Sequence, residues 1–144
     1  RLEVTKRTDL AARVLLALDE AAGRLKGPEL AQRVGTTGGY VTQVVAPLAA
    51  RRWVTSEPGP TGGYALAVPL ATISVLDVVE AVEGPTDDGR CVLTHGTCRS
   101  LEPCALHEAW TVARDQLVTT LAGTSVGAAA TQRASSPAPT KEGS

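Results

Sequence analysis

All the cysteines and histidines of the chain lie between residues 91 and 107. The cysteines are Cys91, Cys98 and Cys104, and the histidines are His95 and His107. Thiolates and imidazoles are the ligands that zinc, copper and iron–sulfur centres prefer, because soft and borderline metals favour sulfur and nitrogen donors. A helix that begins at Pro103 would hold Cys104 and His107 on one face, within reach of one metal. This segment therefore predicts a metal or cluster site, the alternative being buried structural cysteines with one spare thiol.

Length and composition limit what must surround this segment. A chain of 144 residues fits one domain, or a small domain with an appendage. Its hydrophobic residues are mainly Ala, Val and Leu, with no Phe or Met. It contains no apolar run that could span a bilayer and no signal-peptide pattern, so we expect a cytoplasmic protein without a membrane partner. In a reducing compartment, an odd number of clustered cysteines indicates ligands or redox groups rather than disulfides.

The net charge of −1 is unevenly distributed along the chain. Residues 1–67 carry nine Lys and Arg against six Asp and Glu, whereas residues 68–144 carry five against nine. A basic front half can approach a polyanion and an acidic rear half cannot. The distribution favours a nucleic-acid partner for the first half of the chain.

The first half shows the pattern of a helix-turn-helix. Helices are predicted at 9–22, with Thr8 as N-cap and Gly23 at the C-terminal end, at 28–34, which Gly35 ends, and at 38–51, capped by Thr36 or Thr37. A short Gly-containing turn between the second and third helices is typical of this motif. Pro47 removes a hydrogen bond inside the third helix and is expected to bend it.

A β-hairpin is predicted directly after the third helix. Strands at 53–56 and 64–67 flank a Gly-rich turn at 57–63, whose backbone could approach another molecule closely. A hairpin in this position is a wing. Residues 1–68 are therefore interpreted as a winged helix-turn-helix domain for DNA binding, mainly α with a small β wing.

The second half is expected to connect the cysteine segment to this domain and to a partner. A connecting segment, 69–90, contains a helix at 75–83 that Ser74 and Asp77 open as a capping box. A long C-terminal helix is predicted from Pro103 to about Ala122. Its apolar stripe consists of Leu106, Trp110, Ala113, Leu117 and Leu121. A second subunit would cover this stripe, so residues 108–130 are assigned to dimerisation, although packing on the chain's own domain is the alternative. The tail, 131–144, has the composition of a disordered segment.

The ordered set of motifs resembles the IscR/NsrR-type family of bacterial transcription regulators. The resemblance rests on the helix-turn-helix, the wing sequence Pro-Thr-Gly-Gly-Tyr at 60–64, the helix Ser-Val-Leu-Asp-Val-Val-Glu-Ala-Val-Glu-Gly at 74–84, and three cysteines before a long helix. It covers residues 1 to about 130. It implies a homodimer that binds a palindromic double-stranded DNA operator and carries one iron–sulfur cluster per subunit, whose state sets the affinity for DNA.

The resemblance also implies a ligand set. Cys91, Cys98 and Cys104 match the family's three thiolates, and His107 matches the histidine that completes a [2Fe–2S] cluster in the IscR branch. The sequence Thr-Lys-Arg-Thr-Asp-Leu-Ala at 5–11 instead resembles the NsrR branch, where an aspartate at the position of Asp9 completes a [4Fe–4S] cluster. His107, and with it [2Fe–2S], is favoured over Asp9, because the expected helix holds it beside Cys104. His95 is a third candidate, and the first cysteine gap is one residue longer than is usual in the family.

Residues that contact DNA are predicted at the third helix and in the wing. They are Thr37, Tyr40, Thr42, Gln43, Arg51, Thr61 and Gly62. Gln43 is expected to read a base, because glutamine can pair bidentately with adenine, while Thr and Tyr more often reach phosphates. Arg51 would either meet a phosphate or be solvated. Pro58 replaces an arginine that wings of the IscR branch can carry, which predicts weaker charge recognition in the minor groove.

Two rival functions follow from the same residues. A Cys₃His set is also a closed structural zinc site, so a zinc-stabilised DNA-binding regulator without redox sensing is the alternative function. An enzyme is not expected, because the chain has no C-x-x-C pair and no Ser/His/Asp or carboxylate constellation.

Overall fold

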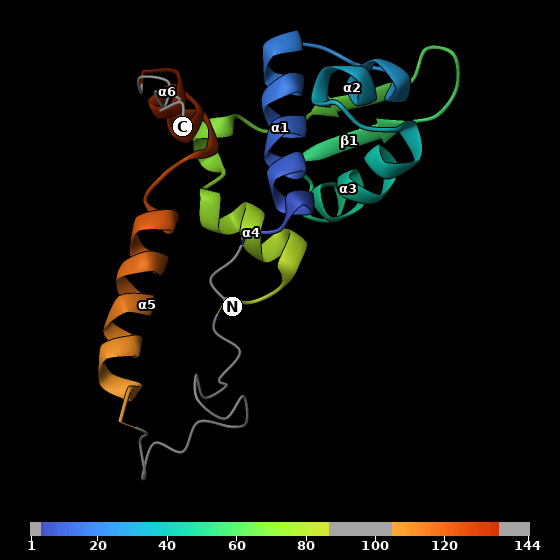
Figure 1. Cartoon of the computed structure of the whole chain (residues 1–144). Helices are drawn as coiled ribbons and strands as arrows, with labels where there is room; N and C mark the ends of the chain where they lie inside the picture. Colours follow the sequence, from blue (N-terminus) through green and yellow to red (C-terminus); the bar gives the residue numbers. More distant parts are fainter. Residues whose placement is uncertain (1–3, 87–104, 136–144) are drawn as a thin grey trace, which may run out of the picture.

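The computed structural model describes residues 4–86 and 105–135, and it is mainly helical with one small antiparallel sheet (Figure 1). The elements in chain order are α1 (Lys6–Ala21), α2 (Gly27–Val34), α3 (Gly38–Ala50), β1 (Val54–Glu57), β2 (Gly63–Leu66), the 3₁₀ helix η1 (Leu70–Thr72), α4 (Val75–Glu83), α5 (His107–Ala122) and α6 (Val126–Ser135). The predicted fold class, a winged helix-turn-helix followed by a long C-terminal helix, is confirmed.

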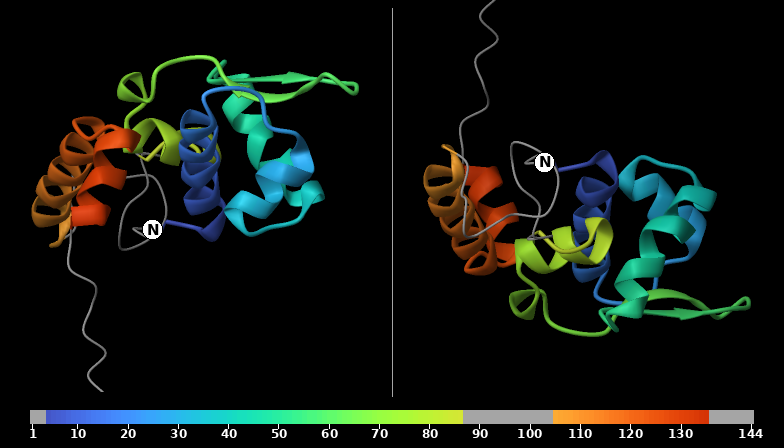
Figure 2. Two further views of the ribbon diagram at one scale, coloured as in Figure 1. Left: turned by 90° about the horizontal axis from the view of Figure 1, so that it is seen from above. Right: turned by 90° about the horizontal axis from the view of Figure 1, so that it is seen from below.

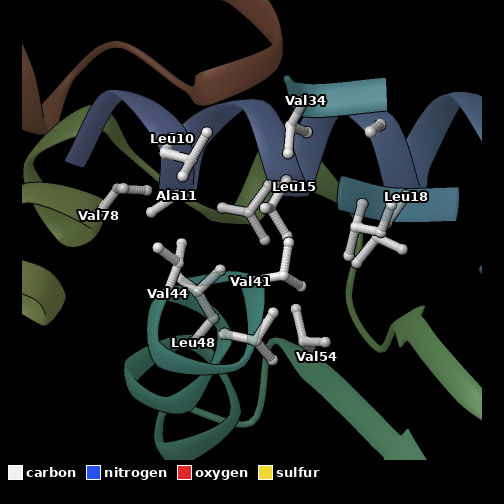
Figure 3. Close-up of a cluster of buried hydrophobic side chains, with 14 of the residues drawn as sticks. Leu10, Ala11, Leu15, Leu18, Val34, Val41, Val44, Leu48, Val54 and Val78 are labelled. Carbon is white, nitrogen blue, oxygen red and sulfur yellow. The ribbon is translucent and has the colours of Figure 1, made fainter. Parts of the chain in front are cut away.

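An aliphatic core joins α1, α2, α3, β1 and α4 (Figure 3). The apolar faces of α1 and α3 meet at its centre, where Val14, Leu15, Val41, Val44 and Leu48 are fully buried. Valine has few rotamers and packs with little loss of side-chain entropy, so a core of Val and Leu can be rigid without any Phe. Truncating one of these leucines to alanine costs about 2–5 kcal/mol in a comparable core.

The predicted boundaries of α2 and α3 agree with the structure to within one residue, and those of α1 need correction. Gly35 ends α2 in the left-handed conformation, with φ of 76°. α1 begins three residues earlier than predicted, because Thr5 rather than Thr8 is its N-cap. Thr8 is buried inside the helix instead, and Ala22 rather than Gly23 takes the left-handed C-terminal position, with φ of 51°.

The wing is a two-stranded hairpin whose register pairs Val54 with Leu66 and Glu57 with Gly63. Gly62 is buried in the turn, where a Cβ would stand 2.0 Å from the carbonyl oxygen of Glu57. The prediction that the wing glycines permit close approach to another molecule therefore needs refinement. At Gly62 the close approach is to the chain's own backbone.

α4 connects the winged domain to the C-terminal helices. Its predicted capping box is confirmed: the N–H of Ser74 donates to Asp77 Oδ2 at 2.9 Å, and the N–H of Asp77 donates to Ser74 Oγ at 3.0 Å. α4 contacts α1 and α3 on one side and α5 on the other. It is therefore the helix on which α5 packs (Figure 2), while α6 contacts α1 and η1.

The C-terminal region differs from the predicted single helix. Ala105 and Leu106 form a turn, so α5 begins at His107, and the prediction that a helix begins at Pro103 is wrong. A second helix, α6, follows and continues to Ser135, so residues 131–135 are helical rather than part of a disordered tail. Main-chain hydrogen bonds from Val75 to Thr124 and from Val126 to Ile73 fix the start of α6 beside α4.

Glu83, the last residue of α4, faces the N-terminal end of α1. Its Oε1 accepts the main-chain N–H of Thr5 at 2.8 Å. Partial burial raises the pKa of Glu83, but hydrogen bonds from the side chain and N–H of Thr5 and from the side chain of Thr8 outweigh it. The pKa therefore lies below its ordinary value of 4.5. The ionised carboxylate also meets the positive end of the α1 dipole.

This contact predicts a pH-dependent stability. Because the pKa of Glu83 is lower in the folded than in the unfolded chain, its contribution is present above the unfolded-state pKa and is lost as the pH falls through the folded-state pKa. We expect Glu83→Gln to lower the free energy of unfolding at about pH 7 by less than about 1 kcal/mol, since the pair is exposed and screened. The loss should shrink as the pH is lowered to about 3, because Glu83 becomes increasingly protonated in the folded chain.

The measurement is urea unfolding of the metal-free chain at both pH values, followed by circular dichroism. Glu20→Gln, on the exposed surface of α1, is the control for removing one negative charge. An equal loss at both pH values in Glu83→Gln would contradict the assignment.

Candidate DNA-binding surface and metal ligands

The N-terminal end of α3 presents the polar residues predicted to contact DNA. Thr37 is the N-cap, and its hydroxyl oxygen accepts the N–H of Tyr40 at 3.3 Å. A hydroxyl that accepts in this way keeps its own proton for donation to a phosphate. Thr42 instead donates its proton to the carbonyl of Gly38 at 3.2 Å, and Tyr40 packs partly against the core. Thr37 is therefore better placed than Thr42 to donate to DNA.

The first turn of α3 is open on its outer side. Gly38 and Gly39 are exposed, and nothing lies within 4 Å of the position that a Cβ would take at either residue. No contact inside the described parts of the chain therefore requires glycine here. Glycine lowers helix stability, but it leaves the N-terminal amides of the helix uncovered, and such amides favour phosphate groups.

Gln43 combines an exposed side chain with an anchored main chain. It lies on the outer face of α3, opposite the buried Val41, Val44 and Val45. Pro47 cannot donate the helical hydrogen bond that the Gln43 carbonyl would otherwise accept. Nη2 of Arg7, from the first turn of α1, donates to this carbonyl at 3.4 Å. The residue predicted to read a base is thus held by a second helix.

Sequence reasoning missed Arg7. The signal that could have indicated such a residue is Pro47, because a proline inside a helix leaves the carbonyl four residues earlier without its usual donor. No local pattern indicates which side chain supplies a replacement. Pro47 does not interrupt α3, because the residues before and after it belong to one continuous helix.

Arg51 and the wing tip complete the predicted surface. The Arg51 guanidinium lies over the ring of Trp53, 5.8 Å from its centroid, and the residue remains exposed. Stacking of this kind limits the directions in which the charge can point. Thr61 is exposed at the wing tip, whereas Gly62 is buried in the turn. Of these two predicted wing contacts, only Thr61 offers a side chain to a partner.

The predicted metal ligands are only partly within the described residues. Cys91, Cys98 and Cys104 lie outside them, as does His95. His107 is the first residue of α5, and the turn before it removes the reason for favouring it, which was a helix shared with Cys104. The described residues 4–86 and 105–135 by themselves contain no group of three metal-binding side chains.

Asp9, the alternative fourth ligand, lies in the first turn of α1. Its Oδ2 pairs with Nε of Arg13 at 3.0 Å, and both side chains are about half exposed. This pair and the position near the helix N-terminus account for an aspartate without a metal. α5, whose first residue is His107, stands apart from α1 in both figures of the whole chain.

Among the described residues, no helix is long and apolar enough to cross a lipid bilayer. This finding concerns only the helices within residues 4–86 and within residues 105–135.

Solved structures support the fold. CymR, the global cysteine regulator of B. subtilis, superposes with a TM-score of 0.73 over 92% of this chain and 98% of its own, at 23% sequence identity. T. potens IscR superposes with a TM-score of 0.71 over 95% of this chain and 93% of its own, at 19% identity. At these identities the likeness establishes the winged-helix architecture alone.

Sequence comparisons identify the family. The model of the Rrf2 family, described as iron-dependent transcriptional regulators, matches residues 4–132. The chain is 35% identical over 126 residues to the HTH-type regulator ORF2 of Azotobacter vinelandii, covering 88% of this chain and 76% of that protein. It is 31% identical over 117 residues to the HTH-type transcriptional regulator IscR of Escherichia coli, covering 81% and 72%. These relatives are named as transcriptional regulators, in agreement with the prediction that the chain is not an enzyme. The chain belongs to the Rrf2 family of DNA-binding transcriptional regulators.

Proposed function

We propose that this regulator is a homodimer that binds a palindromic operator, and that an iron–sulfur cluster bound by Cys91, Cys98 and Cys104 with a fourth donor sets its affinity for DNA. The observation that carries the proposal is the place of the donor segment in the chain. Residues 91–107 connect α4, which packs on α1 and α3, to α5, which contacts α4. A group bound there would tie together the two ends of the segment that links the DNA-binding domain to the C-terminal helices.

The donor set fits this group. Cysteine thiolates, usually four, are the protein ligands of iron–sulfur clusters, and a histidine can replace a cysteine. The family's description as iron-dependent supports iron rather than another metal. When bound, such a cluster supplies sensitivity to redox state, to nitric oxide or to cluster supply. In the branches that the chain resembles, a histidine goes with [2Fe–2S] and an aspartate with [4Fe–4S], so His107 and Asp9 imply different clusters.

The exposed face of α5 supports a homodimer. None of the residues of α5 is buried in the single chain. Val112 is 64% exposed and Leu106, just before the helix, is 54% exposed. Ala113, the first member of the predicted stripe after Val112, is also exposed, whereas Trp110, Leu117 and Leu121 of that stripe are partly buried. An apolar helical face of this kind is covered most simply by the same face of a second subunit.

The link from the donor segment to DNA runs through the positions of α4 and α5. A dimer on a palindrome must hold its two α3 helices about one turn of DNA apart. In the proposed dimer, α5 sets the distance between subunits and α4 joins α5 to the domain that carries α3. A change in residues 91–107 that shifts α4 relative to α5 would therefore change the separation and lower the affinity.

The first prediction from the proposed function concerns the cluster. We expect the protein purified without oxygen to be brown, with matching amounts of iron and sulfide, and we expect Cys98→Ala to lose this absorption while keeping its helical circular dichroism. A colourless protein with one zinc per chain would instead establish the structural-zinc alternative. A colourless protein without zinc would be reconstituted with iron and sulfide, and failure to take up a cluster would exclude the sensor function.

The fourth donor is tested with His107→Ala and Asp9→Ala in the same assay. The variant that removes the ligand should bleach faster in air and shift the visible bands, while the other should match the wild type. The predicted preference for His107 fails if only Asp9→Ala changes the spectrum.

The second prediction concerns base reading. Gln43→Ala should weaken binding to a duplex that the wild-type chain selects from a random-sequence pool by about tenfold or more, because a bidentate contact to a base contributes about 1–3 kcal/mol. It should also relax the preference at one position per half-site. Gln32→Ala, an exposed glutamine of α2, is the matched control and should leave the affinity unchanged. Equal effects of the two variants would refute the role of Gln43.

The third prediction concerns the dimer. Ala113→Asp should weaken self-association by about tenfold or more, because it would bury a charge at the subunit interface. Sedimentation equilibrium measures the effect. Ala113 is exposed in the single chain, so the substitution spares the chain's own packing. Ala128→Asp, at an exposed alanine of α6, is the control, and an unchanged dimer in Ala113→Asp would exclude this face as the interface.

A further inference from the structure

We infer that Arg24, Leu25 and Lys26, which we call the wing anchor, hold the wing in the position from which it meets DNA, and that Lys26 is a positioning residue for the wing tip rather than a phosphate contact. These residues lie in the connection between α1 and α2. Each of them contacts a different part of the wing: Arg24 the end of β1, Leu25 the strand β2, and Lys26 the tip. The inference rests on the proposed contact between the wing tip and DNA.

The middle residue of the anchor forms an isolated antiparallel β-bridge with β2. The N–H of Leu25 donates to the carbonyl of Tyr64 at 2.9 Å, and the N–H of Tyr64 donates to the carbonyl of Leu25 at 2.8 Å. Leu25 itself is buried in the core. A two-stranded hairpin alone is only marginally stable in water, so this third partner gives the wing a fixed base.

The close approach of the anchor to β2 requires a glycine. Gly63 has φ of 133°, a conformation that side chains rarely adopt. A Cβ at this residue would stand 2.7 Å from the carbonyl oxygen of Leu25. Gly62 and Gly63 are therefore explained by packing inside the molecule, and at Gly63 the close contact is with the anchor itself.

The charged residues on either side of Leu25 extend the contact outwards. Nη2 of Arg24 donates to Oε1 of Glu57 at 2.7 Å, and Nη1 donates to Oε2, which makes a bidentate pair with the last residue of β1. Nζ of Lys26 donates to the carbonyl oxygen of Pro60 at 2.5 Å. Arg24 therefore binds the end of β1, and Lys26 binds the tip next to the exposed Thr61.

The geometry changes how the charges of this region are interpreted. A lysine and an arginine beside a wing would ordinarily be assigned to phosphates, since such contacts dominate protein–DNA interfaces. Here Arg24 has its charge matched by Glu57, and Lys26 directs one of its three N–H donors at a main-chain carbonyl. Losing the Lys26 hydrogen bond would free the tip without removing a phosphate contact.

The test compares Lys26→Met, which keeps the length of the side chain but cannot donate, with Lys26→Arg, which keeps the donor. Both are made in the full chain with its metal content intact, and binding to the selected duplex is measured over a range of salt concentrations. We expect Lys26→Met to weaken binding by about fivefold, the order of one exposed hydrogen bond from a charged group. The slope of log affinity against log salt should stay unchanged, and Lys26→Arg should restore the affinity.

Amide hydrogen exchange of the free protein provides a readout that a phosphate contact would not change. We expect faster exchange in residues 57–64 of Lys26→Met and wild-type exchange in Lys26→Arg. A salt slope reduced by about one would identify Lys26 as a phosphate contact and overturn the inference. So would unchanged exchange, or faster exchange with unchanged affinity. Thr61→Val in the wild-type background tests the wing contact itself, so a failure of that proposed contact can be told apart from a failure of the anchor.

Discussion

The arrangement of this protein depends on the packing of α1 against α3. Leu15 of α1 and Val41 and Leu48 of α3 have no exposed surface, and α2, β1 and α4 close the remaining sides of the same core (Figure 3). In a close-packed interior a helix cannot rotate without opening cavities or forcing side chains from their rotamers. The direction in which Gln43 points is therefore determined by buried aliphatic residues on the opposite face of α3. Any signal that alters DNA binding must act on whole elements rather than on this packing.

α4 can transmit such a signal because it contacts both the winged domain and α5. It packs against α1 and α3 through Val78, which is buried, and it contacts α5 on its other side. Its C-terminal residue, Glu83, holds the first turn of α1, and that turn carries Arg7, which donates to the main chain of Gln43. Each of these polar contacts is exposed and weak, so their effect is on orientation more than on stability. An element that is firmly packed at one end and weakly held at the other can shift at small cost.

The sequence predicted the elements of the winged domain well because their signals are local. Periodic Val and Leu, glycines at helix ends and the Gly-rich turn act within a few residues, and these elements were found within a few residues of their predicted bounds. The errors have physical causes. Thr5 and Thr8 are equally good caps by type, and tertiary contact with Glu83 accompanies the use of Thr5. Ala22 takes a conformation that favours glycine although Gly23 follows it, which no propensity predicts. The tail was predicted to begin at residue 131, inside α6, because the composition there is that of a disordered segment, whereas main-chain pairing with the start of α4 holds α6 in place.

The functional surface shows the same division between local and distant causes. The register of α3 was enough to predict that Gln43 is exposed and Val41 buried, since both follow from helical periodicity. It could not show that the carbonyl left without a donor by Pro47 is bound by Arg7, because that contact joins residues 36 positions apart. Proline inside a helix leaves one carbonyl without its main-chain donor, which destabilises the helix unless another group supplies the hydrogen bond. With a donor from α1, the same proline ties α3 to the first turn of its neighbour, so a residue that weakens one helix strengthens the link between two.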